Sequence, residues 1–232
     1  MKMKIKQEIY ITVDAVLFGY SRESGISVLL IKRKIEPFIH KWALPGGFVK
    51  DNESLEDAVM RELNEEAGVK INYLEQLYTF GKPDRDPRAR VVSVVYFGLV
   101  KPDSYKPSAS TDAEDAAWFN MDHLPKLAFD HKTIIQTALE RLRGKITYEP
   151  IGFDLLPAKF PFSDLEKLYI TVLGRDLDRR NFKKKVMGLG IVEELDEKAP
   201  ITSAGRPGNL YKFNRDKYQK LKKDGFSFEM NA

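Results

Sequence analysis

Hydrophobic and polar residues along the first 145 positions follow two patterns, one typical of strands and one typical of helices. Short apolar stretches, some alternating with polar residues and bounded by polar turns, predict strands at residues 9–18, 26–34, 71–81 and 90–100, with a shorter strand within 116–125. Apolar residues three or four positions apart predict helices at residues 54–68 and 131–145. The strand at 90–100 is apolar almost throughout, which is typical of a central strand.

The C-terminal third has a different organisation. The predicted order is a helix, a turn, a second helix and two strands, at residues 163–174, 175–178, 179–190, 191–197 and 209–214. The segment before these elements holds three prolines together with several aromatic residues, which indicates a packed linker. The chain is therefore predicted to form two domains, residues 1–147 and 148–232, with a Pro-rich linker at about 148–162.

The first predicted helix carries an unexpected set of charges. Three carboxylates, Glu62, Glu65 and Glu66, fall within an arc of roughly 100°. The same arc contains Leu55 and Ala58, which mark the side that should be buried. Carboxylates held together at a half-buried position repel one another and lose hydration. Mg²⁺ or Mn²⁺, which prefer oxygen ligands, would relieve both costs and could bridge a diphosphate. The alternative is an ordinary charged helix surface.

The spacing around these carboxylates resembles the Nudix box, with every specified position filled. The matching residues are Gly47, Glu53, Arg61, Glu62, Leu63, Glu65, Glu66, Gly68 and Val69. The resemblance implies that Glu62, Glu65 and Glu66 are metal ligands for Mg²⁺ or Mn²⁺, while Glu53 approaches from the preceding loop. Arg61 would hold a glutamate in place by a charge-assisted hydrogen bond. In an active enzyme, the catalytic residues would be Glu53, Arg61, Glu62, Glu65 and Glu66.

An Arg-Asp-Pro-Arg run precedes the central strand, and it resembles a run found in some Nudix enzymes that act on ADP-ribose. Its arginines could contact phosphates or a sugar, or could equally belong to a solvated loop. The aromatic residues that flank the box could stack on a ligand, although core packing explains them as well. The predicted ligand-binding residues are Trp42, Gly47, Phe48, Arg85 and Arg88. No role is assigned to the three histidines.

The second helix of the C-terminal third begins with "RRNFKKK", which has five basic residues and no acidic one. Two helices separated by a short turn and followed by a hairpin form the outline of a winged helix-turn-helix. Donors on such a helix suit base edges and phosphates of DNA. The predicted DNA-binding residues are Arg179, Arg180, Asn181, Lys183, Lys184 and, at the hairpin tip, Arg206. The alternatives are a solvated helix face or a small dimerisation domain with a basic surface.

Both halves together resemble one family, the Nudix-related transcriptional regulators, over nearly the whole chain. The tail resemblance is carried by "YEPIGFDLLP", "LEKLYITVLGRDLDRRNFKKK" and "GRPGNLYKF". It implies an α+β fold in which a Nudix α/β/α sandwich with a mixed sheet is followed by a winged helix-turn-helix domain. It also implies a homodimer that binds a palindromic operator in double-stranded DNA and responds to a small-molecule effector.

The resemblance leaves the effector and the chemistry open. Members respond to ADP-ribose in nicotinamide-cofactor metabolism or to sugars such as L-arabinose in carbohydrate metabolism. The chain as a whole resembles the sugar-responsive branch more closely, although no single residue shows it. We therefore expect a ligand-responsive transcriptional repressor. Because the box is complete, the alternative is a Mg²⁺-dependent pyrophosphohydrolase of ADP-ribose or a nucleoside diphosphate sugar, or a bifunctional protein.

The amino-acid composition indicates the cellular compartment in which the protein is expected. A chain of 232 residues that is 43% hydrophobic and 31% charged suits two globular domains rather than a disordered protein. The lack of cysteine excludes structural disulfides and favours a reducing compartment. No run of about 18 apolar residues occurs, and the basic N-terminal stretch alternates like a strand, so we expect neither a transmembrane helix nor a signal peptide. The expected location is the cytoplasm, without membrane contact.

Overall fold

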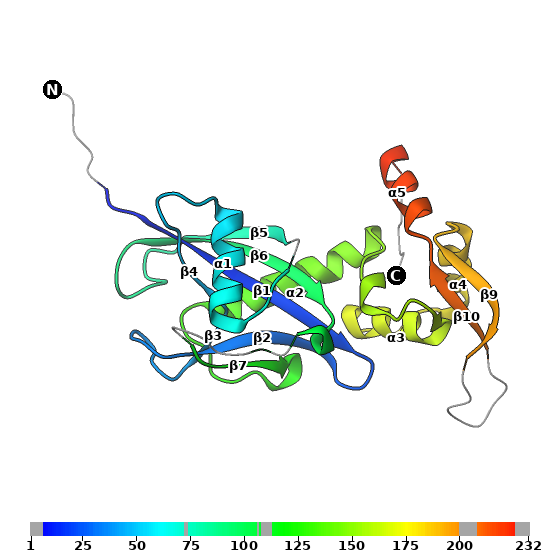
Figure 1. The fold of residues 1–232 in the computed structure, drawn as a ribbon, viewed down its shortest axis with the longest axis horizontal. Coiled ribbons are helices and arrows are strands. Elements are labelled where there is room, and N and C mark those ends of the chain that lie inside the picture. The colour runs from blue at the N-terminus through cyan, green and yellow to red at the C-terminus, as the bar shows by residue number, and fades with distance from the viewer. Residues whose placement is uncertain (1–6, 72–73, 106, 108–112, 200–207, 226–232) are drawn as a thin grey trace. The chain divides into compact units, whose positions relative to one another are not determined.

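The computed structural model describes residues 7–71, 74–105, 107, 113–199 and 208–225. The chain divides into two compact units (Figure 1). The first unit comprises residues 1–19 and 26–140, and the second comprises residues 20–25 and 141–232. The domain boundary predicted between residues 147 and 148 stays a prediction.

Within the described ranges, no helix has both the length and the apolar character that crossing a bilayer would require.

A seven-stranded mixed sheet forms the centre of the first unit. Its hydrogen-bonded order is β3-β2-β1-β6-β5, with β4 paired to β1 and β7 paired to β2. Strands β1 and β6 run parallel, whereas the pairs β1–β4, β2–β3, β2–β7 and β5–β6 are antiparallel. The strands are β1 (Tyr10–Ser21), β2 (Gly25–Arg33), β3 (Trp42–Ala43), β4 (Gly46–Phe48), β5 (Glu75–Phe80), β6 (Val91–Val100) and β7 (Ala113–Asn120). The mixed sheet predicted from the family resemblance is confirmed.

Two helices cover the sheet, with α1 (Leu55–Ala67) on one face and α2 (His131–Tyr148) on the other (Figure 1). Alternate residues of β1, such as Val13 and Leu17, pack with Leu63 of α1 in one fully buried cluster. Helix α1 begins after Ser54, whose side chain caps it by accepting a hydrogen bond from the backbone N–H of Asp57. Sheet and helices together form the expected α/β/α sandwich. Short 3₁₀ helices lie at Pro102–Ser104, Met121–His123 and Phe153–Leu155.

Helix α2 contributes to both units. Its first ten residues, 131–140, belong to the first unit, and its last eight, 141–148, belong to the second. The tip of the β1–β2 hairpin, residues 20–25, is also part of the second unit. There Arg22 Nη1 lies 2.7 Å from Asp164 Oδ1. Both segments of the Nudix-like half therefore help to build the C-terminal unit.

The second unit is a winged helix-turn-helix, as predicted. Its elements are β8 (Phe160–Pro161), α3 (Phe162–Leu173), α4 (Arg179–Gly188), β9 (Val192–Lys198), β10 (Asn209–Phe213) and α5 (Arg215–Asp224). The core joins α3 to α4 through the fully buried Tyr169 and the ring of Phe182, whose centroids are 4.8 Å apart. The three strands pair in the order β8-β10-β9, so the end of the Pro-rich linker forms part of the wing sheet. Helix α5 has no counterpart in the sequence prediction.

Removing the cap of α4 should destabilise the winged-helix unit. The side chain of Asp178 accepts hydrogen bonds from the backbone N–H groups of Arg180 and Asn181, both at 3.0 Å. We expect Asp178→Ala to lower the free energy of unfolding by about 1 kcal/mol, because two helix-terminal donors lose their acceptor. Urea unfolding followed by circular dichroism measures the change. Asp178→Ser, which keeps an acceptor, is the control, and equal losses in both variants would contradict the prediction.

Candidate functional site

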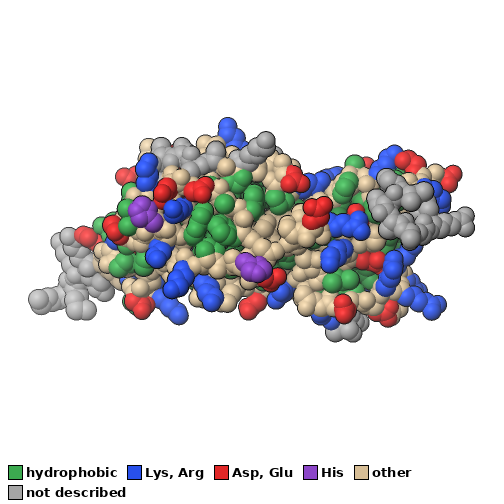
Figure 2. All heavy atoms as spheres, turned by 90° about the horizontal axis from the view of Figure 1, so that it is seen from below, with side chains coloured by type: hydrophobic (Ala, Val, Ile, Leu, Met, Phe, Trp, Pro, Cys, Tyr) green, Lys and Arg blue, Asp and Glu red, His purple; other side chains and the backbone are tan. Residues whose placement is uncertain are grey.

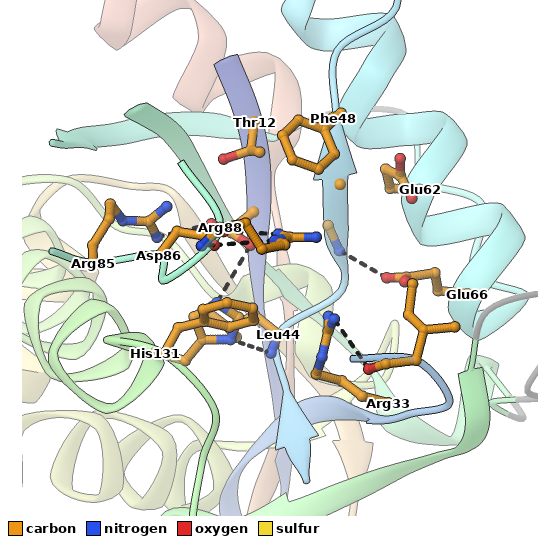
Figure 3. A pocket seen from close by; sticks show the side chains of 15 residues that line it. Thr12, Arg33, Leu44, Phe48, Glu62, Glu66, Arg85, Asp86, Arg88 and His131 are labelled. Carbon is orange, nitrogen blue, oxygen red and sulfur yellow. Dashed lines mark hydrogen bonds and ion pairs between the residues drawn. The ribbon is translucent and has the colours of Figure 1, made fainter. Parts of the chain in front are cut away.

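A cavity of about 150 Å³ opens in the first unit, where the sheet meets the N-terminus of α2 and one side of α1 (Figure 3). Charged residues of both signs line it, together with two aromatic rings. The lining residues are Thr12, Asp14, Arg33, Ile35, Leu44, Gly46, Gly47, Phe48, Glu62, Glu66, Arg85, Asp86, Arg88, Phe129 and His131. This mixture suits a ligand that is itself polar and charged.

Arg61 gathers the carboxylates of the Nudix-like segment. Its Nε and Nη2 bind Glu53 at 2.8 and 2.6 Å, which is a bidentate pair. Its Nη1 donates to Glu62 at 2.7 Å and to Glu65 at 3.1 Å. The hydrogen bonds from Arg61 lower the pKa of Glu53 to about 2, so that carboxylate stays ionised. Arg61 has the role that the resemblance implied, and it holds three glutamates rather than one.

Only two of the predicted catalytic carboxylates, Glu62 and Glu66, line the cavity. Glu66 is buried, and this burial raises its pKa to about 8, even though the N–H of Gly46 donates to it at 2.8 Å. Burial also raises the pKa of Glu62. The third predicted metal ligand, Glu65, keeps 43% of its side chain exposed and contacts Arg61. A Cβ atom at Gly47 would lie 2.4 Å from Glu62 Oε1, so glycine allows the close approach there.

The predicted metal site is therefore only partly assembled. Among residues in the described ranges, no three or more His, Asp or Glu side chains are grouped so as to hold a metal ion. Glu62 and Glu66 nevertheless fit a divalent cation, because their oxygens are hard ligands and burial makes their ionisation costly. Bound Mg²⁺ or Mn²⁺ would supply positive charge for phosphate oxygens there. Glu65 would have to turn away from Arg61 to join them, and the three-ligand set stays a prediction.

Asp14 forms a buried polar floor in the cavity. It accepts a hydrogen bond of 2.5 Å from Ser93 and lies 3.6 Å from both Arg85 and His131. The backbone N–H of Leu44 donates to Nδ1 of His131 at 2.8 Å, so the neutral ring carries its proton on Nε2, toward Asp14. Burial lowers the pKa of His131, which favours this neutral form.

Three arginines line the cavity with different partners. Arg85 makes a bidentate pair with Asp130 at 2.9 and 3.1 Å, and Arg88 makes one with Asp86 at 2.7 and 3.0 Å. Arg33 instead donates to two backbone carbonyls, those of residues 37 and 35, at 2.8 and 3.4 Å. Of the three, Arg33 alone therefore keeps its positive charge without a carboxylate in contact, among the residues that the structure describes.

The structure brings together four of the five predicted ligand-binding residues, which are Gly47, Phe48, Arg85 and Arg88. Trp42 does not line the cavity, because its ring packs against Phe119 with centroids 4.5 Å apart. Sequence reasoning missed Asp14, Arg33, Phe129 and His131. Asp14 left a signal, since it is a charged residue in the middle of an otherwise buried strand. No comparable pattern in the sequence singled out Arg33 or His131, because each lies at the end of a predicted strand or helix, where charged and polar residues are common.

The predicted DNA-binding residues on α4 differ in the contacts that their side chains make within the protein. Arg180 and Lys184 are exposed. Arg179 is 78% exposed, although its Nε lies 2.9 Å from Glu166 Oε1 on α3. The amide of Asn181 donates to the capping Asp178 at 2.7 Å. Lys183 donates to the hydroxyl of Tyr211 at 2.9 Å and lies over the Phe162 ring, so its ammonium is held against the wing sheet. The predicted wing-tip residue Arg206 lies outside the described residues.

The buried histidine should make stability depend on pH. Because the pKa of His131 in the folded state lies below the unfolded value of 6.5, the unfolded chain takes up a proton first as the pH falls. We expect the free energy of unfolding to decrease below about pH 6.5. In His131→Asn, whose amide oxygen can still accept from Leu44, this decrease should be smaller. Thermal melts from pH 5 to 8 measure it, and unchanged curves in the variant would contradict the prediction.

Comparison with known proteins places these two units in a family. Residues 10–138 match the NUDIX domain, and residues 152–213 match the NrtR DNA-binding winged helix domain. The chain is 34% identical to the ADPR responsive transcriptional repressor NtrR of Acinetobacter baylyi, over 89% of this chain and 83% of that protein. It is 43% identical to the ADP-ribose pyrophosphatase of Methanocaldococcus jannaschii, over 58% of this chain and 75% of that protein.

Solved structures of similar proteins support the same assignment. The structure of Shewanella oneidensis NrtR complexed with a 27mer DNA is 32% identical, with a TM-score of 0.75 over 96% of this chain and 99% of that chain. The NUDIX domain of the same protein complexed with ADP ribose is 38% identical, with a TM-score of 0.54 over 61% of this chain and 94% of that chain. With both domain matches in one chain and similarity over nearly its full length, the chain belongs to the NrtR group of the Nudix family, which joins a Nudix domain to a DNA-binding winged helix.

Proposed function

We propose that this protein is a transcriptional repressor that binds a DNA operator and is regulated by ADP-ribose. The observation that carries the proposal is the pairing, in one chain, of a cavity lined by arginines and carboxylates with an exposed basic helix in a winged helix-turn-helix. Relatives named for ADP-ribose and for repression support it, as does a related protein solved with DNA. Control of nicotinamide-cofactor metabolism in the cytoplasm is the setting that this effector favours.

DNA binding would rely on a local surface rather than on the charge of the whole molecule. The net charge is only +4, and Figure 2 shows Lys and Arg interspersed with Asp and Glu over the face that it presents. On α4, Arg179, Arg180 and Lys184 keep exposed side chains. These residues are suited to base edges and phosphates of the major groove. Lys183, held by Tyr211, would support the helix instead.

The operator is expected to be palindromic because we propose a homodimer. Two copies of α4 would then enter major-groove faces about 34–36 Å apart or a multiple of that distance. For ADP-ribose to release the DNA, it must bind the free form more tightly than the DNA-bound form. The effector thus acts by its differential affinity, and no hydrolysis is needed.

L-Arabinose or a related sugar remains the alternative effector, with carbohydrate metabolism as the regulated process. It stands on the overall resemblance of the sequence, whereas the relatives reported above are named for ADP-ribose. The charged cavity also favours a ligand with phosphates over a neutral sugar.

Shortening an exposed arginine of α4 should weaken operator binding. If Arg180 contacts a base edge, we expect Arg180→Ala to weaken the free energy of operator binding by about 1–3 kcal/mol. If it contacts a phosphate, the slope of log affinity against log salt concentration should instead become shallower by about 1. Fluorescence anisotropy with DNA from upstream of the protein's own operon, at several salt concentrations, measures both. Lys70→Ala, an exposed lysine in the first unit, is the control. Equal affinity in both variants and the wild type would contradict the prediction.

ADP-ribose should dissociate the protein from that DNA. Titration of the complex with ADP-ribose is expected to reduce anisotropy, whereas AMP and L-arabinose at the same concentrations should not. Release by L-arabinose alone would transfer the role of effector to the sugar. The absence of sequence-specific DNA binding at any salt concentration would remove the repressor itself.

A hydrolase is the second candidate function, because all box positions are filled and a relative is an ADP-ribose pyrophosphatase. If the protein turns over ADP-ribose with Mg²⁺ or Mn²⁺, AMP should appear, and Glu65→Gln should abolish it. Glu65 is a suitable position because it is partly exposed, so the substitution should leave the fold intact. Chromatography of the products measures turnover. Operator binding should survive Glu65→Gln, and AMP release together with operator binding would indicate a bifunctional protein.

A further inference from the structure

The arginines of the cavity differ in how their charge is balanced. Arg85 is neutralised twice, by the bidentate pair with Asp130 and by Asp14 at 3.6 Å. Arg88 is neutralised by its bidentate pair with Asp86. Arg33 has only carbonyl acceptors among the described residues. Arg33 is therefore the one guanidinium of the three that has no carboxylate in contact among the described residues.

Arg33 and Arg88 also lie close to each other. Their guanidinium groups lie over the same ring, Phe129, at 5.0 and 5.8 Å from its centroid. A second ring, Phe48, lies 4.9 Å from the guanidinium of Arg88. Burial and the nearby Arg88 both lower the pKa of Arg33, while Glu66, Asp86 and Asp14 act on it only from a distance. The guanidinium of Arg33, which has no carboxylate in contact among the described residues, is therefore held close to a second guanidinium, that of Arg88.

Donor atoms remain available on both side chains. Each guanidinium uses its Nε and Nη2 atoms for contacts inside the protein. Its Nη1 has no hydrogen bond to any residue in the described ranges. Figure 3 shows Arg33, Arg88 and Glu66 of α1 among the side chains that line the cavity. Arg33 comes from the end of β2 and Arg88 from the β5–β6 loop, so the two reach the same space from different elements.

We infer that Arg33 and Arg88 form a phosphate-binding site on the wall of the cavity that faces α1. A phosphate would receive N–H donors from both guanidinium groups and would separate their charges. The rings of Phe48 and Phe129 would keep the guanidinium planes fixed without competing for the donors. This inference rests on the proposed function, and it names the residues that would bind a phosphate of ADP-ribose. Arg85, which contacts two carboxylates, would have a structural role instead.

The position of the site sets it apart from the box carboxylates. Glu62 and Glu66 would repel a phosphate unless a divalent cation came between them. The pair Arg33 and Arg88 needs no such cation, because it supplies the positive charge itself. Binding of phosphates should therefore persist when divalent metal is removed, and this property separates the two possible sites.

Calorimetric titration of the full chain in buffer with EDTA tests the inference. The wild type is expected to bind ADP-ribose and, more weakly, pyrophosphate. Arg33→Gln should reduce the affinity for both about 10- to 100-fold, which is the usual effect of losing hydrogen bonds to a charged group. Arg33→Lys, which keeps the charge but not the paired donors, should lose less. Inorganic phosphate distinguishes recognition of a single free phosphate from recognition of a diphosphate.

Arg90→Gln is the matched control. Arg90 also donates to a backbone carbonyl, that of Gly81 at 2.7 Å, but it does not line the cavity. Its affinity for ADP-ribose should equal that of the wild type. Without ligand, the melting temperature of Arg33→Gln should be no lower than that of Arg90→Gln, because replacing Arg33 also removes its repulsion with the nearby Arg88.

Each result has a definite meaning. Equal binding of ADP-ribose by Arg33→Gln and the wild type would overturn the phosphate site while leaving the proposed effector intact. Binding that requires Mg²⁺ would also overturn it, because the carboxylate side would then hold the phosphates. If Arg33→Gln fails to fold, Arg33→Lys and the EDTA titration of the wild type still decide. No binding of ADP-ribose by the wild type, with or without metal, would instead remove the proposed function.

Discussion

The hydrogen bonds of Arg61 are the interaction on which the cavity depends. This one guanidinium joins three separate segments, since it binds Glu53 before α1, two glutamates on α1, and the carbonyl of Phe48 on β4 at 3.2 Å. Without a cation at that point, carboxylates at neighbouring positions would repel one another and the helix would move away from the strand. Arg61 therefore offsets part of the negative charge of the box, and it holds Glu62 beside Gly47.

The two walls of the cavity are balanced in different ways. On α1, the carboxylates outnumber the cations, and the difference is absorbed by burial, which raises the pKa of Glu66. On the opposite wall, arginines are paired with aspartates except at Arg33. Phe129, whose ring lies under the guanidinium groups of Arg33 and Arg88, has a positive φ of 48°, a conformation that costs energy in a residue other than glycine. The cavity is thus held in an arrangement that local backbone preferences alone would not select.

Much of the fold followed from the sequence, because each segment carried a local signal. The apolar strands β1 and β6 and the helices α1 and α4 all appear close to the residues where they were expected. Elements without such a signal were missed. β8 has only two residues, and α5 is almost entirely polar, so neither shows a hydrophobic periodicity.

The site was harder to predict because its residues meet only through tertiary contacts. The box spacing located Glu62 and Glu66, since a helix places them by its own geometry. Arg33 and His131 are distant in sequence and reach the cavity only through the sheet order and the start of α2. Conversely, Trp42 is a residue type suited to ligands, but its ring packs against Phe119. Lys183 is exposed, yet its ammonium also donates to the hydroxyl of Tyr211, and its role in DNA binding stays a prediction. Residue type alone could not reveal those partners.

Helix α2 has a consequence for any attempt to separate the two activities. Its 18 residues form one helix of roughly 27 Å, and the division between the units falls within it. A protease that cut there would leave broken backbone hydrogen bonds on both new ends, since each helix terminus exposes up to four unpaired groups. A sensor fragment that ended at residue 140 would also lose Leu142 and Ile146 from the buried side of the helix. The effector-binding half can therefore be shortened safely only beyond the end of α2.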